Sequence, residues 1–161
     1  MIRNSLLLLT LFCCLLGCNT EISIQDETTD PVAQEYPLAY VSRPLLDQDG
    51  NPYQLSLTAP EQFNAGARLI LKQNAFAESP ERELLAELFP GNSYDVKDLV
   101  VSADGDTLLF ALRPPELADV ADELQPSWSI WRYSRSTDSV EPVIADPLRA
   151  EQGHDIAPAF L

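Results

Sequence analysis

The chain has 161 residues, 45% of them hydrophobic, and its formal net charge at pH 7 is -15. This length and composition suit one domain with a packed core. The negative charge disfavours binding to DNA or RNA, because such a surface repels the phosphate backbone. We therefore expect no nucleic-acid partner, and we interpret most of the acidity as solvated surface.

Residues 1–17 have the pattern of an export signal. Arg3 precedes an apolar stretch, residues 6–16, that is shorter than the about 20 residues needed to cross a bilayer as a helix. The stretch ends in Leu-Leu-Gly-Cys18, which resembles the lipobox of bacterial lipoproteins. This resemblance implies that residues 1–17 are a signal peptide, and that the chain is cut before Cys18 and acylated on its thiol. An ordinary secretory signal is the alternative.

The cysteine count agrees with this interpretation. Cys13, Cys14 and Cys18 are the only cysteines, so cleavage would leave the mature domain without a thiol for a disulfide, a zinc site or a nucleophile. Residues 18–36 comprise the lipidated cysteine and a polar, acidic stretch that predicts a flexible tether. Asn19, in place of aspartate, favours the outer membrane by resemblance to the sorting pattern of diderm bacteria. We thus expect a periplasm-facing envelope protein whose partner is the lipid bilayer.

A β-hairpin is the clearest local prediction. Two apolar runs, residues 96–101 and 107–112, flank a turn that contains Asp104 and Gly105. Glycine accepts the positive φ that a tight hairpin needs. Both faces of the runs are largely apolar, so we expect the hairpin to be covered on both sides. A calcium loop is the alternative for the turn, but the spaced series of ligands ending in glutamate is missing.

Two more strands are predicted after the hairpin. Residues 129–134 are rich in aromatic and β-favouring side chains, and residues 140–145 follow after a short turn. Pro142 cannot donate a ladder hydrogen bond, so the last strand should lie at a sheet edge. Residues 95–145 are therefore predicted to form a four-stranded antiparallel meander, which is the form of a β-propeller blade.

An earlier part of the chain repeats this pattern. Residues 38–44 and residues 108–114 are both apolar runs that end in Arg-Pro. We therefore expect strands at residues 38–42 and 67–72. A third element is expected at residues 82–89, either as a strand or as a short helix, because its leucines also recur at helical spacing.

The last residues of the chain repeat the start of the hairpin. The pair Tyr94-Asp95 corresponds to His154-Asp155, and in both places a β-branched residue follows. The repeat is roughly 60 to 70 residues long, more than the about 40–45 of a compact blade, so the loops must be long. Residues 154–161 are thus predicted to begin another blade.

This interpretation makes the chain a fragment of a propeller. It contains about two blades, whereas a closed propeller needs about four to eight. The alternative is that residues 155–161 pair back on residues 38–41 and close a small β-domain.

Residues 36–161 also resemble a known family. The phrases YDVKDLVVSADGDTLLFALRPP, WSIWRY and GHDIAPAFL are similar to bacterial lipoproteins related to the alpha subunit of hydrazine synthase, in its propeller-containing middle region. More broadly, the hairpin resembles the Asp-Gly repeat of TolB-like and WD40-like propellers. The resemblance implies an all-β fold, with residues 37–161 forming incomplete antiparallel blades after the signal peptide and tether. The namesake subunit holds haem on cysteine motifs that this chain lacks, so no cofactor is expected.

His154 is the only histidine of the chain. We expect the rings of Tyr94 and His154 to pack at blade junctions and the carboxylates of Asp95 and Asp155 to bond nearby backbone. A haem or metal ligand completed by other sequence is the alternative for His154.

The other candidate sites are interpreted as structural. Residues 115–126 form the most acidic stretch of the domain, which we interpret as a solvated loop or short helix, with cation or partner binding as the alternative. Trp128 and Trp131 are expected to pack inside the blade. Neither a serine elbow of the Gly-x-Ser-x-Gly type nor a glycine-rich phosphate loop is present, so no catalytic residues are assigned.

The leading functional hypothesis is a membrane-anchored lipoprotein that acts as a non-catalytic binding or scaffold module, with an envelope protein as its partner. The rival, suggested only by the family resemblance, is a fragment of a haem-associated redox enzyme subunit. A third hypothesis is a degraded remnant without function.

Overall fold

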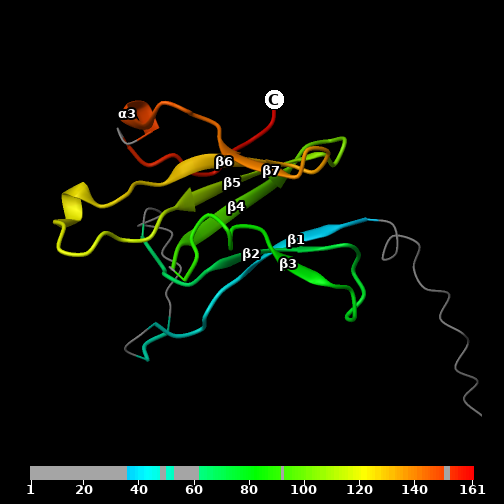
Figure 1. The fold of residues 1–161 in the computed structure, drawn as a ribbon, viewed down its shortest axis with the longest axis horizontal. Helices are drawn as coiled ribbons and strands as arrows, with labels where there is room; N and C mark the ends of the chain where they lie inside the picture. The colour runs from blue at the N-terminus through cyan, green and yellow to red at the C-terminus, as the bar shows by residue number, and fades with distance from the viewer. Residues whose placement is uncertain (1–35, 48–49, 53–61, 92, 151–152) are drawn as a thin grey trace, which may run out of the picture. The chain divides into compact units, whose positions relative to one another are not determined.

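The computed structural model describes residues 36–47, 50–52, 62–91, 93–150 and 153–161. Their fold is all-β, as predicted: two antiparallel sheets, one of three strands and one of four, that do not close into a barrel (Figure 1). The predicted signal peptide and all but the last residue of the predicted tether lie outside the described residues. Within the part that is described, no helix has the length and apolar character to cross a membrane.

The first sheet has the order β1-β2-β3, with β1 at Leu38–Ser42, β2 at Arg68–Lys72 and β3 at Glu81–Glu83. All neighbours are antiparallel, and β1 pairs with β2 along its whole length. The bounds of β1 and β2 agree with the predicted strands to within one residue. The pattern of apolar runs in the sequence therefore predicted the positions of β1 and β2 correctly.

The third element of this sheet differs from the prediction of a strand or short helix at residues 82–89. Only Glu81–Glu83 forms a strand, and the backbone then turns, with the N–H groups of Leu88 and Phe89 bonded to the carbonyl of Leu85. The Leu85 side chain is fully buried in the core between the sheets. The chain thus leaves the sheet after Glu83 and places this leucine in the core, so both sequence-based alternatives were wrong for most of the segment.

The second sheet is the predicted four-stranded meander. Its order is β4-β5-β6-β7, with β4 at Asp95–Val101, β5 at Thr107–Arg113, β6 at Ser129–Ser134 and β7 at Ser139–Pro142. β7 lies at the edge, as Pro142 indicated, but it ends there and not at residue 145. A single-turn helix, α3 at Pro147–Ala150, follows (Figure 1).

Two backbone details shape the β4–β5 hairpin. Gly105 adopts the positive φ expected of the turn, at 71°, and the Gly105 N–H bonds the Ser102 carbonyl. β4 contains a bulge between Lys97 and Val100, where Asp98 has a φ of 55° and the register with β5 shifts. The bulge was not predicted, although the adjacent charged residues Lys97 and Asp98 interrupt the apolar run at this point.

The core lies between the two sheets. β2 contributes Leu69, while β4 and β5 contribute Val96, Leu108, Phe110 and Leu112, of which none is more than 4% exposed. Burying a side chain of this size stabilises a fold by about 1.5–3 kcal/mol. Neither sheet could bury its apolar face alone, so the two sheets form one folding unit.

The sheets stack in the way that successive propeller blades do. In β1 the side chains that face the second sheet are Ala39 and Val41, and in β5 those that face the first sheet are Leu108 and Phe110. In the sequence repeat, Ala39 corresponds to Leu109, the neighbour of Leu108 that points the other way. The two sheets therefore use opposite faces of equivalent strands.

The segment at residues 153–161 forms no strand and makes no pairing with β1 among the described residues. It lies on the second sheet instead, where the N–H of Asp155 bonds the Trp128 carbonyl and the N–H of Ala157 bonds the Asp98 carboxylate. The expected strand and the alternative of pairing back on residues 38–41 are both absent from the described fold.

We predict that Gly66→Ala destabilises the domain while Gly153→Ala does not. Gly66 has a φ of +91°, and a Cβ there would lie 3.2 Å from the Pro44 Cγ atom. A left-handed backbone alone costs an L-residue about 1–2 kcal/mol. Gly153 has no atom within 4 Å of an added Cβ. Urea unfolding followed by tryptophan fluorescence measures both variants, and equal midpoints would contradict the prediction.

Candidate functional site

A cleft of about 350 Å³ opens between the two sheets, at the end where β4 turns into β5. Its walls are apolar and come from both sheets, with Leu38 and Leu71 on one side and Val101 and Leu108 on the other. This volume falls in the range of small ligand pockets in proteins. A space of this kind suits the apolar side chains of a bound molecule.

Charged side chains surround the cleft. The cations are Lys72, Arg82 and Arg135, and the acids are Glu81 and Asp106. Three of the ten Lys and Arg residues of the chain are therefore gathered here, against two of the 25 Asp and Glu residues. Lys72 pairs with Glu81 at 3.4 Å and Arg82 pairs with Asp138 at 2.5 Å, so Arg135 is the rim cation that can complement an anionic group in a ligand.

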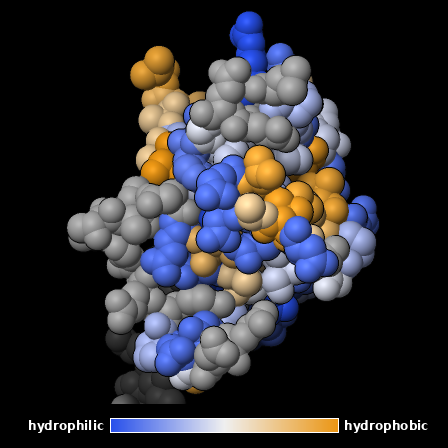
Figure 2. Space-filling model, turned by 90° about the vertical axis from the view of Figure 1, so that its left-hand side faces the viewer, coloured by the Kyte–Doolittle hydropathy of each residue, from blue (hydrophilic) through white to orange (hydrophobic). Residues whose placement is uncertain are grey.

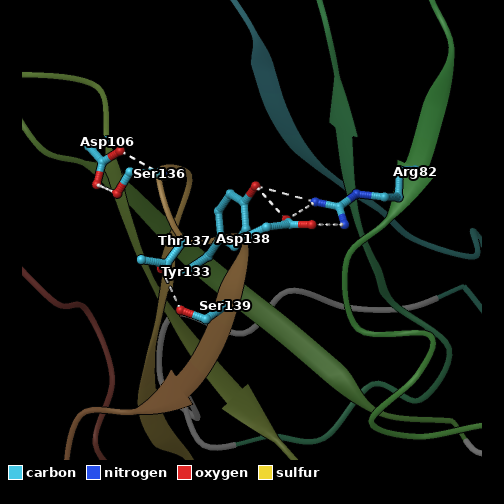
Figure 3. Close-up of polar contacts among 7 residues, drawn as sticks. All are labelled: Arg82, Asp106, Tyr133, Ser136, Thr137, Asp138 and Ser139. Atoms are coloured by element: carbon cyan, nitrogen blue, oxygen red, sulfur yellow. Dashed lines mark hydrogen bonds and ion pairs between the residues drawn. The ribbon is translucent and has the colours of Figure 1, made fainter.

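Arg82 joins the two sheets at the rim of the cleft (Figure 3). Its guanidinium reaches from β3 to the turn between β6 and β7, where it donates to both carboxylate oxygens of Asp138, at 2.5 and 3.1 Å. It also donates to the Tyr133 hydroxyl at 3.3 Å, and that hydroxyl donates to Asp138 at 3.0 Å. The three side chains form one closed network that links the two sheets at this rim of the cleft.

The network also shifts the protonation of its members. The hydrogen bond from Arg82, followed by that from Tyr133, lowers the pKa of the Asp138 carboxyl. Burial, followed by the hydrogen bond to Asp138, raises the pKa of the Tyr133 hydroxyl. Both groups thus keep the charge states that the network needs near neutral pH.

Asp106 fixes the opposite side of the cleft by tying two hairpin turns together (Figure 3). Its carboxylate accepts hydrogen bonds from the Ser136 N–H at 2.9 Å and from the hydroxyls of Ser134 and Ser136 at 3.1 and 3.0 Å. Its backbone carbonyl accepts a further bond from the Arg135 N–H at 2.8 Å. The turn that carries Asp106 is therefore held rigidly against the end of β6.

The predicted turn residue Asp104 has a local role. Its carboxylate accepts hydrogen bonds from the Ser102 hydroxyl at 2.6 Å and from the Asp106 N–H at 3.1 Å, and these bonds lower the pKa of the Asp104 carboxyl. Asp104 and Gly105 shape the turn, and only Gly105 also lines the cleft.

Tyr94 and Asp95, the other pair from the sequence repeat, lie away from the cleft. Asp95 is 1% exposed and pairs with Arg43 at 2.6 Å, while the Asn64 N–H donates to its other oxygen at 2.8 Å. Burial raises the pKa of the Asp95 carboxyl, and the Arg43 charge opposes that rise. Tyr94 is buried and donates to Glu83 at 2.9 Å. Through these contacts with Arg43 and Glu83, Asp95 and Tyr94 link the two sheets at a place away from the cleft.

His154 and Asp155 lie at the equivalent place after the second sheet. The Nδ1 atom of His154 accepts a hydrogen bond from the Trp128 N–H at 3.1 Å, and the Asp155 N–H donates to the Trp128 carbonyl at 2.9 Å. Trp128 is fully buried, with Lys97 over its ring at 4.2 Å. The structure therefore places His154 in a backbone contact, and no cluster of three metal-ligating side chains occurs among the residues it describes.

A second groove, of about 600 Å³, lies at the opposite end of the second sheet. Leu117 and Leu124 of the acidic loop and Ile144 after β7 line it, and all three are exposed. Gln125 closes the loop on itself by bonding the Leu117 backbone at 2.8 and 2.9 Å. Figure 2 views this end of the domain and shows hydrophobic surface gathered beside hydrophilic surface. The groove offers few charged groups, so the cleft is the better candidate site.

The sequence interpretation missed the residues that build the cleft. Arg82 was assigned only to a strand or helix, and Asp138 only to a turn, because the contact between them joins positions 56 residues apart. The repeat did contain one usable signal. Arg43 belongs to the Arg-Pro motif that ends the run at residues 38–44, and its partner Asp95 belongs to the Tyr94-Asp95 motif. The two repeated motifs therefore contact each other in the folded chain.

No protein-family model matches this chain, and no curated protein or solved structure is significantly similar to it.

We predict that Arg82→Met lowers the urea midpoint at pH 7, whereas Arg135→Met, at the same rim, changes it little. The folded pKa of Asp138 lies below its unfolded value, so the stabilisation is present above about pH 3.9 and is lost as the pH falls through the folded pKa. The difference between wild type and Arg82→Met should therefore shrink as the pH falls through the folded pKa of the Asp138 carboxyl. A difference that stays constant with pH would contradict this role for Asp138.

Proposed function

We propose that this chain is a lipid-anchored protein of a bacterial cell envelope, and that its β-sheet domain binds a partner protein without catalysing a reaction. The cleft between the sheets is the observation that carries the proposal. It combines an apolar interior with a rim of charged side chains, carried on strands and turns of both sheets. Such a surface recognises a ligand by shape and charge, and it needs no reactive group to do so.

The partner that fits the cleft best is a peptide segment with apolar side chains and an acidic group. The apolar walls, Leu38, Leu71, Val101 and Leu108, suit aliphatic or aromatic side chains. Arg135 is exposed at the rim, where its charge also helps to lower the pKa of the Asp104 carboxyl, so a carboxylate of the partner is the complementary group.

The anchor is proposed from the sequence alone. The charged N-terminus, the short apolar stretch and the run Leu-Leu-Gly-Cys18 support acylation of Cys18, and Asn19 supports the outer membrane. As part of the same proposal we keep the relationship to propeller-containing lipoproteins of the hydrazine synthase alpha-subunit type. The all-β fold of stacked sheets is compatible with that relationship.

We predict that radiolabelled palmitate labels the wild-type chain and the Cys14→Ala variant but not Cys18→Ala. Cys14 precedes the proposed cut, so its loss should not matter, whereas Cys18 is the proposed acceptor. The labelled wild type should fractionate with the outer membrane. Label that persists in Cys18→Ala would exclude this anchor, and an Asn19→Asp variant that stays in the outer membrane would exclude the sorting signal.

We predict that a photo-crosslinking amino acid at Thr107, inside the cleft, captures a protein other than this chain in cells of the source organism. The same amino acid at Thr137, on an exposed turn outside the cleft, serves as the matched control. Val101→Arg fills the cleft from an exposed position and should reduce the Thr107 adduct at least about fivefold. Equal adducts at Thr107 and Thr137, or an adduct that Val101→Arg does not change, would contradict binding in the cleft.

A further inference from the structure

The groove of about 600 Å³ beside the acidic loop, here called the loop groove, is lined by strand residues and by loop residues. Trp131 and Pro142, which lie opposite each other on β6 and β7, belong to its strand side. Leu117 and Leu124 belong to its loop side, and Ile144 follows β7. In Figure 1 the loop before β6 and the segment after β7 lie at the same end of the second sheet. Segments well apart in the sequence therefore build this groove together.

Apolar side chains are exposed around the loop groove. Leu117 is 53% exposed, Leu124 is 73% exposed and Ile144 is 39% exposed. Single exposed apolar residues are normal on a protein surface, whereas several gathered at one place mark an interaction site. Their position around one groove favours a ligand that brings apolar side chains of its own.

Gln125 holds the loop side of the groove in place. Its side-chain oxygen accepts a hydrogen bond from the Leu117 N–H at 2.8 Å. Its side-chain nitrogen donates to the carbonyls of Leu117 and Val120, at 2.9 and 3.0 Å. These three hydrogen bonds join the end of the loop to its start. The groove is thus formed before a ligand arrives, which lowers the entropic cost of binding.

Trp131 presents its ring to a ligand and not its N–H group. The indole N–H donates to the Ser129 hydroxyl at 3.0 Å, so the one polar group of the side chain is already bonded within the domain. The ring itself is only half-buried. A tryptophan ring attracts a cation more strongly than any other aromatic side chain does. The strand side of the groove therefore suits an apolar group or a cation.

The charge at the loop groove is negative. Glu123 lines the groove, and Asp119 and Asp122 lie on the same loop. All three are exposed, and none of them makes an ion pair with a residue that the structure describes. The described residues that line the groove include no lysine and no arginine. A cationic partner is complementary to this surface, whereas an anionic lipid surface is repelled by it.

The arginines closest to the loop in the sequence do not neutralise these three acids. Arg113 pairs with Glu116 at 3.7 Å, and Arg149 pairs with Asp146 at 3.8 Å. Each arginine is therefore matched by an acid of its own. The charge of Glu123 and of the two aspartates is left to attract a partner.

We propose that the loop groove binds a segment of a partner protein in which apolar side chains alternate with arginine or lysine. The apolar side chains lie between Leu117, Leu124 and Trp131, and the cationic groups meet Glu123 at the rim. The stems of arginine and lysine are apolar themselves, so they also pack well against leucine. The charge of this ligand is opposite to that of the group proposed for the cleft, where Arg135 is the rim cation.

This second site goes beyond the proposed function, which concerns the cleft between the sheets. The two sites share no lining residue among those that the structure describes. The Thr107 adduct reports on the cleft, and the experiment below reports on the loop groove. Either site can therefore fail its test without deciding the other.

The test adds a blocked hexapeptide of alternating leucine and arginine to the isotope-labelled full-length chain in a non-ionic detergent. The chain has two tryptophans, whose indole N–H signals in NMR spectra are separate probes. Trp131 lines the groove, whereas Trp128 is fully buried and does not line it. We expect the Trp131 signal to shift and to saturate, while the Trp128 signal and the amide signal of Val101 in the cleft stay in place. A Trp131→Phe variant assigns the signal.

Two pairs of variants separate the groove from general attraction to an acidic chain. Glu123→Lys should weaken the affinity at least about fivefold, because repulsion replaces attraction at the rim. Glu87→Lys makes the same change of charge on an exposed turn elsewhere, so it should change the affinity less than about twofold. Leu124→Ser should weaken the affinity about threefold or more through lost apolar contact. Leu45→Ser, at another exposed leucine, should leave it unchanged.

Four results would overturn the proposal. One is an equal shift of the Trp131 signal with a hexapeptide of alternating leucine and glutamate or with vesicles of anionic lipid. Another is an equal loss of affinity in Glu123→Lys and Glu87→Lys. A third is a Trp131 signal that moves with protein concentration in the absence of peptide, because a second copy would then occupy the groove. The last is a Trp131 signal that the leucine-arginine peptide does not move.

Discussion

The contact between the inner faces of the two sheets is the interaction on which the rest of the domain depends. A three-stranded and a four-stranded sheet each have one apolar face to bury, and each is too small to bury it alone. Leu69 and Phe110 meet in this layer, and Leu85 is drawn into it from a turn that leaves the sheet early.

Two ion pairs join the sheets at opposite ends of that layer. Arg43 is partly buried and Asp95 is fully buried. Loss of either partner would leave the other charge unpaired in an apolar setting, which destabilises a fold. Arg82 and Asp138 are exposed and are screened by solvent, but Tyr133 and the geometry of two parallel hydrogen bonds make their contact directional. The cleft lies beside this second pair, and its shape is therefore tied to the spacing of the sheets.

The strands themselves were readable from the sequence, because each is a short apolar run bounded by turn residues. The hairpin at Gly105 and the edge position of the strand that contains Pro142 were predicted from local chemistry, although that strand ends at Pro142 and not at residue 145. The signal-like N-terminus and Cys18 are likewise features of sequence alone. The local β-propensity of each segment thus determined where most strands lie along the chain.

Tertiary structure decided which faces meet and which charges pair. Arg82 and Asp138 come from elements 56 residues apart, and Asp106 reaches Ser136 from 30 residues away, so no periodicity in the sequence could connect them. The same holds for Leu85, whose burial ended a strand that the sequence pattern extended. The cleft exists only because two sheets are held at a set spacing, and that spacing results from long-range packing and hydrogen bonds.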